Sequence, residues 1–328
     1  MEQKEIMIRR VNALDIDALL KLYDIVWPNV DYDKHAKARF MLEYSTGVGY
    51  GAECKGKMIG SHLSIYQNFY VGDRKIKCVE TGDTCVDPCS QGLGLFQKIY
   101  CAFRRDFFDN EKGDLIWGIS APGAVRSFTK AGKQFIDTTM KLRHFSQPMR
   151  TLWKIKGDIR ELRKPIIWDK ISESYDIDEL LLEKRESLLN TSQLLHLRYD
   201  KETFAWRLKS DSGIKCFLVQ DLGMILYKIG RRGKIVEIGI GEVFLYDYTI
   251  SSFKRLYRYF KSKLHPDIVW VIVSKGHPLC NIYSKAGFIT NPKKKFLPHC
   301  VLAESDEMKN IGYNPNNWAV TSLDIDTF

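Results

Sequence analysis

The stretch from Val86 to Ile99, VDPCSQGLGLFQKI, decides the fold expected for this chain. It follows strand-like residues, holds Gly92 and Gly94 two positions apart, and continues into a segment with helical apolar spacing. Glycine lets a backbone approach a ligand closely, and the first turn of a helix presents N–H groups without partners inside the helix. This order of strand, glycine turn and helix predicts an anion site, typically for phosphate. A tight turn that binds nothing is the alternative that the loop alone leaves open.

The flanking segments predict alternating strands and helices, and hence an α/β (α+β) fold. A strand near residues 6–11 is followed by a helix that presents Leu19, Leu20 and Tyr23 on one side. Glycines in GVGYG, residues 47–51, are expected to form a turn into the second strand and not a P-loop, because no Gly-Lys-Ser/Thr follows. The remaining predicted elements are three strands within 50–86, a helix over 95–110, a strand over 114–120 and a helix over 123–132.

The sequence then repeats itself. DLIW at 114–117 recurs as DIVW at 267–270, and FTKAGK at 128–133 recurs as YSKAGF at 283–288, an offset of about 155 residues. We therefore expect two similar domains, 1–155 and 156–328, the second including a linker. In the first copy Gln91 precedes Asp114 by 23 residues. The residue 23 positions before Asp267 in the second copy is Phe244, in FLYDYT, where no glycine pair occurs. The second copy is thus expected to lack the phosphate loop.

Composition limits the possible partners. With 45% hydrophobic and 27% charged residues, the chain of 328 residues is typical of globular soluble proteins. It has no apolar run long enough for a membrane span and no signal-peptide core, so a cytoplasmic location without a membrane partner is expected. The net charge of +10 favours an anionic partner, but the cations are spread out, which favours phosphorylated small molecules over nucleic acid. The eight cysteines are scattered without ligand spacing, so no metal is expected.

The opening stretch resembles the acyl-CoA loop of the GCN5-related N-acetyltransferase (GNAT) superfamily, whose pattern is Gln/Arg-x-x-Gly-x-Gly/Ala after the fourth strand. Gln91 takes the first place, Gly94 matches the glycine, and Phe96 stands where Gly or Ala is usual. FTKAG also resembles the family's motif near the end of its fourth helix. The resemblance covers residues 5–150 and, through the repeat, 195–290. It implies two tandem GNAT-like domains, each a mixed central sheet with flanking helices, the second degenerate.

The resemblance implies acyl-CoA as co-substrate and direct acyl transfer without a metal. The residues that it assigns to acyl-CoA are Thr84, Cys85, Val86, Gln91, Gly92, Leu93, Gly94, Leu95 and Phe96. A carboxylate on the fourth strand is a common base for the acceptor amine, which leaves Glu80 and Asp83 as candidates. They face opposite sides of a regular strand, so only one is expected to reach the acyl group unless a bulge intervenes.

Other residue types near the loop carry weaker expectations. Phe128 stands where many family members place a tyrosine acid, and Tyr283, at the equivalent place in the second copy, is expected in the core. Cys85 and Cys89 have no evident histidine partner, so covalent catalysis is not expected. His62 and His144 lie in the first copy, where they could line the cleft, but each is expected to be a structural or surface histidine.

Two GNAT-like copies with one CoA loop resemble bacterial N-acyltransferases of nucleotide-linked amino sugars, which act on dTDP- or UDP-aminodeoxyhexoses in polysaccharide biosynthesis. The second copy would then build the acceptor wall, with the active site between the domains. An aminoglycoside, a polyamine or a peptide amine is the alternative acceptor. A basic binding protein that keeps the fold without activity is the non-enzymatic alternative.

Overall fold

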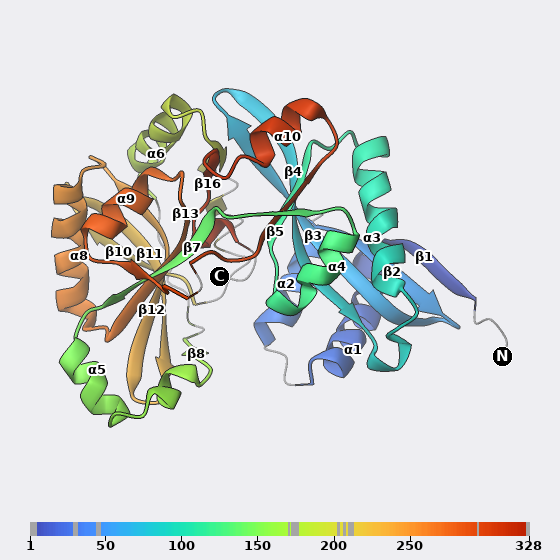
Figure 1. The fold of residues 1–328 in the computed structure, drawn as a ribbon, viewed down its shortest axis with the longest axis horizontal. Coiled ribbons are helices and arrows are strands. Elements are labelled where there is room, and N and C mark those ends of the chain that lie inside the picture. Colours follow the sequence, from blue (N-terminus) through green and yellow to red (C-terminus); the bar gives the residue numbers. More distant parts are fainter. Residues whose placement is uncertain are drawn as a thin grey trace.

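The fold consists of two mixed β-sheets side by side, with helices packed against them (Figure 1). This computed structural model describes residues 5–28, 32–43, 47–169, 171, 177–201, 204–205, 208, 213–293 and 295–325. The first sheet lies with α1–α4 on the right of Figure 1, and the second lies with α5, α8 and α9 on the left. None of the helices in these ranges is long and apolar enough to cross a membrane.

The first sheet has the strand order β1-β2-β3-β4-β5-β15-β6. Strands β1 to β4 pair antiparallel, with β2–β3 and β3–β4 as hairpins, whereas β4 and β5 are parallel. The bounds are β1 (Ile6–Val11), β2 (Gly47–Cys54), β3 (Lys57–Val71), β4 (Arg74–Val86), β5 (Leu115–Ile119), β15 (His299–Ala303) and β6 (Gln134–Ile136), with the short strands β9 (Leu195–Leu197) and β16 (Trp318–Ala319) attached through β3.

One predicted turn is a strand. The GVGYG stretch lies inside β2, and its glycines serve close packing. A Cβ at Gly49 would come within 2.2 Å of Val11, and one at Gly51 would come within 2.9 Å of the same side chain. Glycine in a strand commonly marks such an approach of neighbouring groups, and the turn prediction was therefore wrong.

Helices cover both faces of the first sheet. On one face α1 (Ile16–Val26) and α2 (Tyr32–Glu43) pack on β3 through residues such as Leu19, Met41 and Leu63. On the other face α3 (Leu95–Arg105) and α4 (Val125–Lys130) pack on Val79 and Ile116 of β4 and β5. Side chains alternate along a strand, so the neighbours of Val79 on β4 point to the α1–α2 face.

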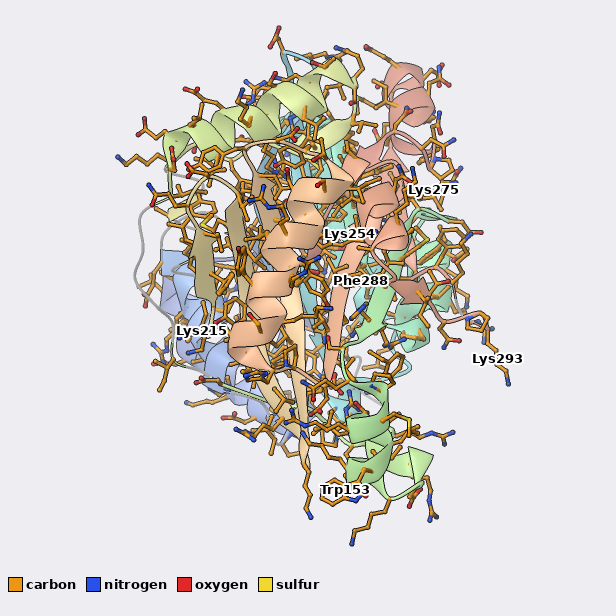
Figure 2. All side chains as sticks on the ribbon, turned by 90° about the vertical axis from the view of Figure 1, so that its left-hand side faces the viewer. Trp153, Lys215, Lys254, Lys275, Phe288 and Lys293 are labelled. Carbon is orange, nitrogen blue, oxygen red and sulfur yellow. The ribbon has the colours of Figure 1, made fainter. Side chains whose placement is uncertain are left out.

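The second sheet has the order β10-β11-β12-β13-β7-β14. The bounds are β10 (Lys215–Val219), β11 (Gly223–Arg232), β12 (Ile235–Leu245), β13 (Ile268–Ser274), β7 (Thr139–Phe145) and β14 (Ile289–Thr290), with β8 (Ile167–Trp168) beside β11. The helices of this half are α5 (Pro148–Ile155), α6 (Glu179–Thr191), α8 (Ile250–Leu264) and α9 (Pro278–Lys285), whereas α10 (Asp306–Gly312) packs on β15 of the first sheet. Figure 2 looks onto α8, with Lys254 on its outer side and Trp153 projecting from α5.

The two sheets exchange one strand. β7 comes from the N-terminal part of the chain but pairs with β13 and β14 in the second sheet. Conversely, β15 comes from the C-terminal part and pairs with β5 and β6 in the first sheet. The predicted boundary near residue 155 falls at the end of α5, whereas each sheet takes a strand from the other side of it. Neither sheet is therefore complete without both parts of the chain.

The sequence repeat corresponds to a repeated structure. The Asp114 backbone N–H donates to the Lys77 carbonyl, and its carboxylate accepts from the Lys77 N–H at 2.8 Å. Asp267 makes the same two contacts with Val236, with the carboxylate again 2.8 Å from the N–H. Each aspartate thus ties the start of a parallel strand to its neighbour, which explains why DLIW and DIVW recur.

Candidate active site

The strands β4 and β5 separate into a fork. They pair only over residues 78–80 and 115–117, although β4 continues to Val86. The vertex of the fork is closed by Thr81, whose Oγ1 donates to the Trp117 carbonyl oxygen at 3.1 Å. Beyond it the facing backbone edges of the two strands no longer hydrogen-bond to each other, which leaves them available to an extended ligand.

A β-bulge lies in β4 beside the vertex. His62 pairs with Thr84 and Ser64 with Thr81, so Gly82 and Asp83 together oppose one residue of β3. A bulge leaves the extra residue out of the ladder and re-aims the side chains beyond it. Because this bulge lies between Glu80 and Asp83, the two carboxylates need not face opposite sides of β4, and both could approach the fork.

The bulge recurs in the second sheet. There Leu226 pairs with Glu242 and Tyr227 with Ile240, which leaves Gly241 as the extra residue of β12. The sequences Gly82-Asp83 and Gly241-Glu242 thus occupy the same place in the two copies. Glu242 is completely buried and lies 3.2 Å from the Arg185 guanidinium, and burial raises its pKa to about 7.

The two candidate bases have different surroundings. Glu80 is only 1% exposed, and its carboxylate accepts a hydrogen bond from Gln67 Nε2 at 2.9 Å. Gln67 in turn accepts from Trp117 Nε1 and donates to the Asp324 carbonyl, so Glu80 belongs to a buried network that includes the C-terminal segment. The side chain of Asp83 is 18% exposed, and its carboxylate lies 3.0 Å from Lys34 Nζ of α2.

The loop after β4 is fixed at one end and open at the other. Asp87 accepts from Lys57 Nζ and from the Cys89 N–H, both at 2.9 Å, which holds the loop against the β2–β3 turn. Gly92 and Gly94 adopt φ values of +85° and +67°, and a Cβ on either would meet no atom within 4 Å. Glycine is needed there for its left-handed backbone, and both residues are exposed with open space beside them.

The helices that follow β4 and β12 begin differently. At α3 the N-cap is Gly94, which offers no side-chain acceptor to the first-turn N–H groups. At α8 the Thr249 side chain accepts from the Ser252 N–H, and the Asp247 carboxylate accepts from both hydroxyls. The segment between strand and helix is also longer in the first copy (residues 87–94, between β4 and α3) than in the second (residues 246–249, between β12 and α8). An anion is therefore favoured at α3, while at α8 a carboxylate already occupies the electropositive end of the helix.

Aromatic side chains and one lysine line the fork on the α3–α4 side. Phe96 packs edge-to-face on Phe128 with ring centroids 5.2 Å apart, and Tyr100 contacts both rings. Lys133 reaches this cluster with its Nζ 4.1 Å from the centre of the Phe128 ring and 3.0 Å from Thr81 Oγ1. Sequence reasoning missed Lys133, although the repeat contains a signal, because FTKAGK ends in lysine where YSKAGF ends in phenylalanine.

The remaining loop residues divide between core and surface. Leu95 is buried in the α3 core, whereas Gln91, Gly92, Leu93 and Gly94 are exposed. Cys85 is buried against Ser61, and burial raises the pKa of its thiol to about 12, which disfavours a nucleophilic thiolate.

The two histidines considered from the sequence, and Tyr283, are packed among aromatic side chains. His62 is enclosed by Tyr100 and Phe103, and burial lowers its pKa to about 3. His144 lies in the second sheet beside Tyr257, and burial lowers its pKa to about 4. Tyr283 is fully buried, as predicted. Within the described ranges no three potential metal ligands cluster.

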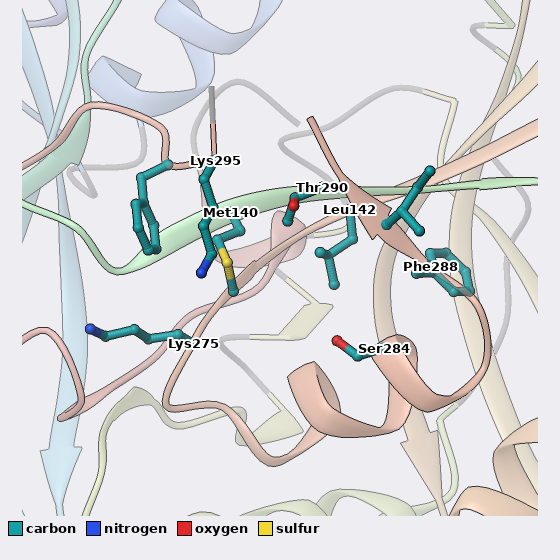
Figure 3. Close-up of a pocket in the computed structure, with 9 residues that line it drawn as sticks. Met140, Leu142, Lys275, Ser284, Phe288, Thr290 and Lys295 are labelled. Atoms are coloured by element: carbon teal, nitrogen blue, oxygen red, sulfur yellow. The ribbon is translucent and has the colours of Figure 1, made fainter. Parts of the chain in front are cut away.

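A pocket of about 400 Å³ lies where α9, β7 and β14 meet. Figure 3 shows Lys275 and Lys295 at one end and Ser284 and Phe288 at the other. Neither lysine forms an ion pair with the residues whose placement is described, and both ammonium groups lie within 6.0 Å of the Phe296 ring centre. The pocket therefore combines positive charge with apolar walls.

Residues 7–123 match the family model of the acetyltransferase (GNAT) domain. No curated protein matches the sequence. Among solved structures, a GCN5-related N-acetyltransferase from Anabaena variabilis has a TM-score of 0.62 and 9% identity, over 90% of this chain and 72% of that chain. A tandem GNAT protein from the clavulanic acid biosynthesis pathway has a TM-score of 0.54 and 11% identity, over 92% of this chain and 100% of that chain.

The glucosamine N-acetyltransferase region of a fungal multi-domain β-N-acetylglucosaminidase also matches, with a TM-score of 0.53 and 13% identity. The match spans 92% of this chain and 38% of that chain. At such identities these likenesses establish the fold alone. They confirm the tandem GNAT-like fold that was predicted.

Proposed function

We propose that the chain is an N-acyltransferase of the GNAT superfamily, because residues 7–123 match the acetyltransferase domain of that family, and from this premise follow how it binds acyl-CoA and which amine it acylates. The thioester arm lies along residues 84–86 in the fork. The pyrophosphate lies on the N–H groups of residues 91–96. The observation that carries this assignment is the start of α3, where two glycines with positive φ adjoin an empty space and no side chain caps the helix. The second half lacks such a site and binds no CoA.

We assign the acceptor base to Asp83. A base must come within hydrogen-bond reach of the amine, directly or through one water molecule. Asp83 follows the bulge and is partly exposed, whereas Glu80 is enclosed by Gln67 and the C-terminal segment. A backbone N–H freed by the bulge at Gly82 polarises the thioester carbonyl in the manner of an oxyanion hole. Glu80 then serves to position β4.

We propose that the acceptor is an amino sugar linked to a nucleotide such as dTDP or UDP. The pocket with Lys275 and Lys295 supplies cations for the diphosphate and aromatic surface for the base. Phe296 in this pocket and Cys300 at the fork are four residues apart, so their Cα atoms are at most about 14 Å apart. An elongated sugar nucleotide could therefore occupy the pocket while its amine lies in the fork. The name of the fungal relative, a glucosamine N-acetyltransferase region, also accords with an amino-sugar acceptor.

The proposed location is the cytoplasm, where acyl-CoA and sugar nucleotides are made. None of the eight cysteines forms a disulfide, and Cys89 and Cys101 are exposed, which suits a reducing compartment.

The experiment is a thiol-release assay with several acyl-CoAs against nucleotide-linked amino sugars, the free sugars, aminoglycosides, polyamines and peptides. We expect release that depends on the nucleotide-linked sugar. If thiol is released only with an aminoglycoside, a polyamine or a peptide, the acceptor belongs to that class and not to the nucleotide-linked amino sugars. Tight binding of RNA or DNA without any turnover would contradict the enzyme assignment.

A further inference from the structure

Lys133 is a buried lysine at the vertex of the fork. Only 2% of the residue is exposed, and its ammonium group donates to Thr81 Oγ1 at 3.0 Å and contacts Cys300 Sγ at 3.5 Å. Phe128 and Tyr100 present their ring faces to it. Among the described residues no carboxylate contacts it. Burying a charged lysine without an acidic partner is costly, so a structural role alone does not account for this residue.

The second copy shows that the fold does not need a lysine at this place. Phe288 occupies the equivalent position at the end of α9 and packs on Tyr283, as Lys133 packs on Phe128. The same helix-to-strand junction is therefore built there with a phenylalanine. The lysine occurs only in the copy that has the glycine loop and the uncapped α3.

We propose that Lys133 is a catalytic residue that protonates the departing CoA thiolate. The acceptor nitrogen forms the new C–N bond at the thioester carbonyl carbon, the C–S bond breaks, and its electron pair stays on sulfur. Lys133 gives a proton from Nζ to this sulfur and releases CoA as the thiol, while Asp83 or water takes the proton lost by the acceptor nitrogen. Solvent restores the lysine proton before the next turnover. This inference rests on the proposed acyl-CoA reaction.

The position of Nζ supports this role. Thr81 is the first residue of β4 beyond the paired segment, so an acyl-thioester that enters the open end of the fork stops beside the lysine. Phe128 stands where the resemblance expects a tyrosine acid, and it offers no proton. A cation against aromatic faces in a water-poor site strongly stabilises a developing anion.

Among the titratable groups around the vertex of the fork, Lys133 is the best proton donor near neutral pH. Tyr100 of α3, His62 of β3, and Cys300 and His299 of β15 face or adjoin it. Burial lowers the pKa of both histidines to about 3, so neither carries a proton to donate near neutral pH. Burial also lowers the pKa of Lys133 and raises that of Tyr100. The activity should therefore fall as alkaline pH removes the proton from Lys133.

The test compares Lys133→Met with Lys130→Met, a change of an exposed lysine at the end of α4, three residues before Lys133. The first readout is the pKa of the CoA thiol bound to each protein. It is measured from the thiolate absorbance as a function of pH, after subtraction of the absorbance of the protein alone. We expect the wild type and Lys130→Met to lower the thiol pKa by about one unit or more, and Lys133→Met not to lower it. The second readout is turnover, for which we expect about a 100-fold lower kcat and loss of the alkaline fall in Lys133→Met.

The outcomes separate the two proposals. If the wild type neither binds CoA nor releases thiol, the acyl-CoA function fails. If the wild type is active and Lys133→Met lowers the thiol pKa of bound CoA as much as the wild type does, with the same kcat, only the role of Lys133 is overturned. Should Lys133→Met fold poorly, Lys133→Phe copies the residue of the second half and provides the same comparison.

Discussion

The Asp83 carboxylate lies 3.0 Å from Lys34 Nζ, across the gap between the bulged strand β4 and helix α2. This pair places a partly exposed carboxylate beside the fork and within ion-pair distance of a lysine. If Asp83 takes the acceptor proton, Asp83→Asn should lower kcat by about 100-fold with little change in the KM for acyl-CoA. Steady-state kinetics at saturating acceptor measure this effect.

Glu80→Gln is the comparison for this prediction. Its amide oxygen can still accept from Gln67, so we expect less than a tenfold loss of kcat. The opposite pattern, a 100-fold loss in Glu80→Gln and full activity in Asp83→Asn, would transfer the role of base to Glu80.

Gly94 should be required for acyl-CoA binding and not for folding. A side chain there is strained by the positive φ and projects into the empty space that we assign to phosphate, so Gly94→Val should raise the KM for acyl-CoA at least tenfold. Gly157→Ala is the control, because Gly157 also has a positive φ and empty surroundings but lies beyond α5. Equal effects of both changes on KM would argue against a ligand at Gly94.

The pocket lysines should govern the acceptor. Lys275→Ala and Lys295→Ala are each expected to raise the KM for a nucleotide-linked acceptor by about tenfold, since each removes a charged contact to phosphate. The KM for acyl-CoA should stay constant. Lys254→Ala, on the outer face of α8, is the control (Figure 2). Unchanged acceptor kinetics in both pocket variants would place the acceptor elsewhere.

The repeated aspartates should differ in their contribution to stability. Asp267 is fully buried and pairs with Lys154 and Arg150 of α5, so Asp267→Ala leaves the largely buried Lys154 ammonium unpaired and should cost about 3 kcal/mol of unfolding free energy. Asp114 accepts the same backbone bond but is less buried, and Asp114→Ala should cost about 1 kcal/mol. Denaturant unfolding measures both values. A larger loss at Asp114 would contradict the role assigned to the α5 contacts.

Local patterns were enough to predict much of this fold. Alternation and turn residues located β3 and β4, apolar spacing located α3, and the DLIW and DIVW match located the two parallel strands. The exchange of β7 and β15 was not predictable in this way. Strand periodicity says which residues share a face, but not which of two similar sheets accepts the strand.

The candidate site was predictable to the same extent. The glycine loop carries its signal in residue type, because only glycine adopts those φ values without strain. The bulge beside Asp83 depends on the register between β3 and β4, which the sequence of β4 alone does not reveal. Lys133 was missed because a lysine after a helix is usually exposed, and its burial depends on Cys300 in the exchanged strand.

Calorimetric titration with CoA tests the central claim, that the first fork and its glycine loop alone hold the co-substrate. We expect one CoA per chain, and at least a tenfold weaker affinity in Gly94→Val. The change Thr249→Ala at the start of α8 should leave both the affinity and the ratio unaltered. Two CoA molecules per chain, or an affinity that Gly94→Val does not change, would contradict the claim.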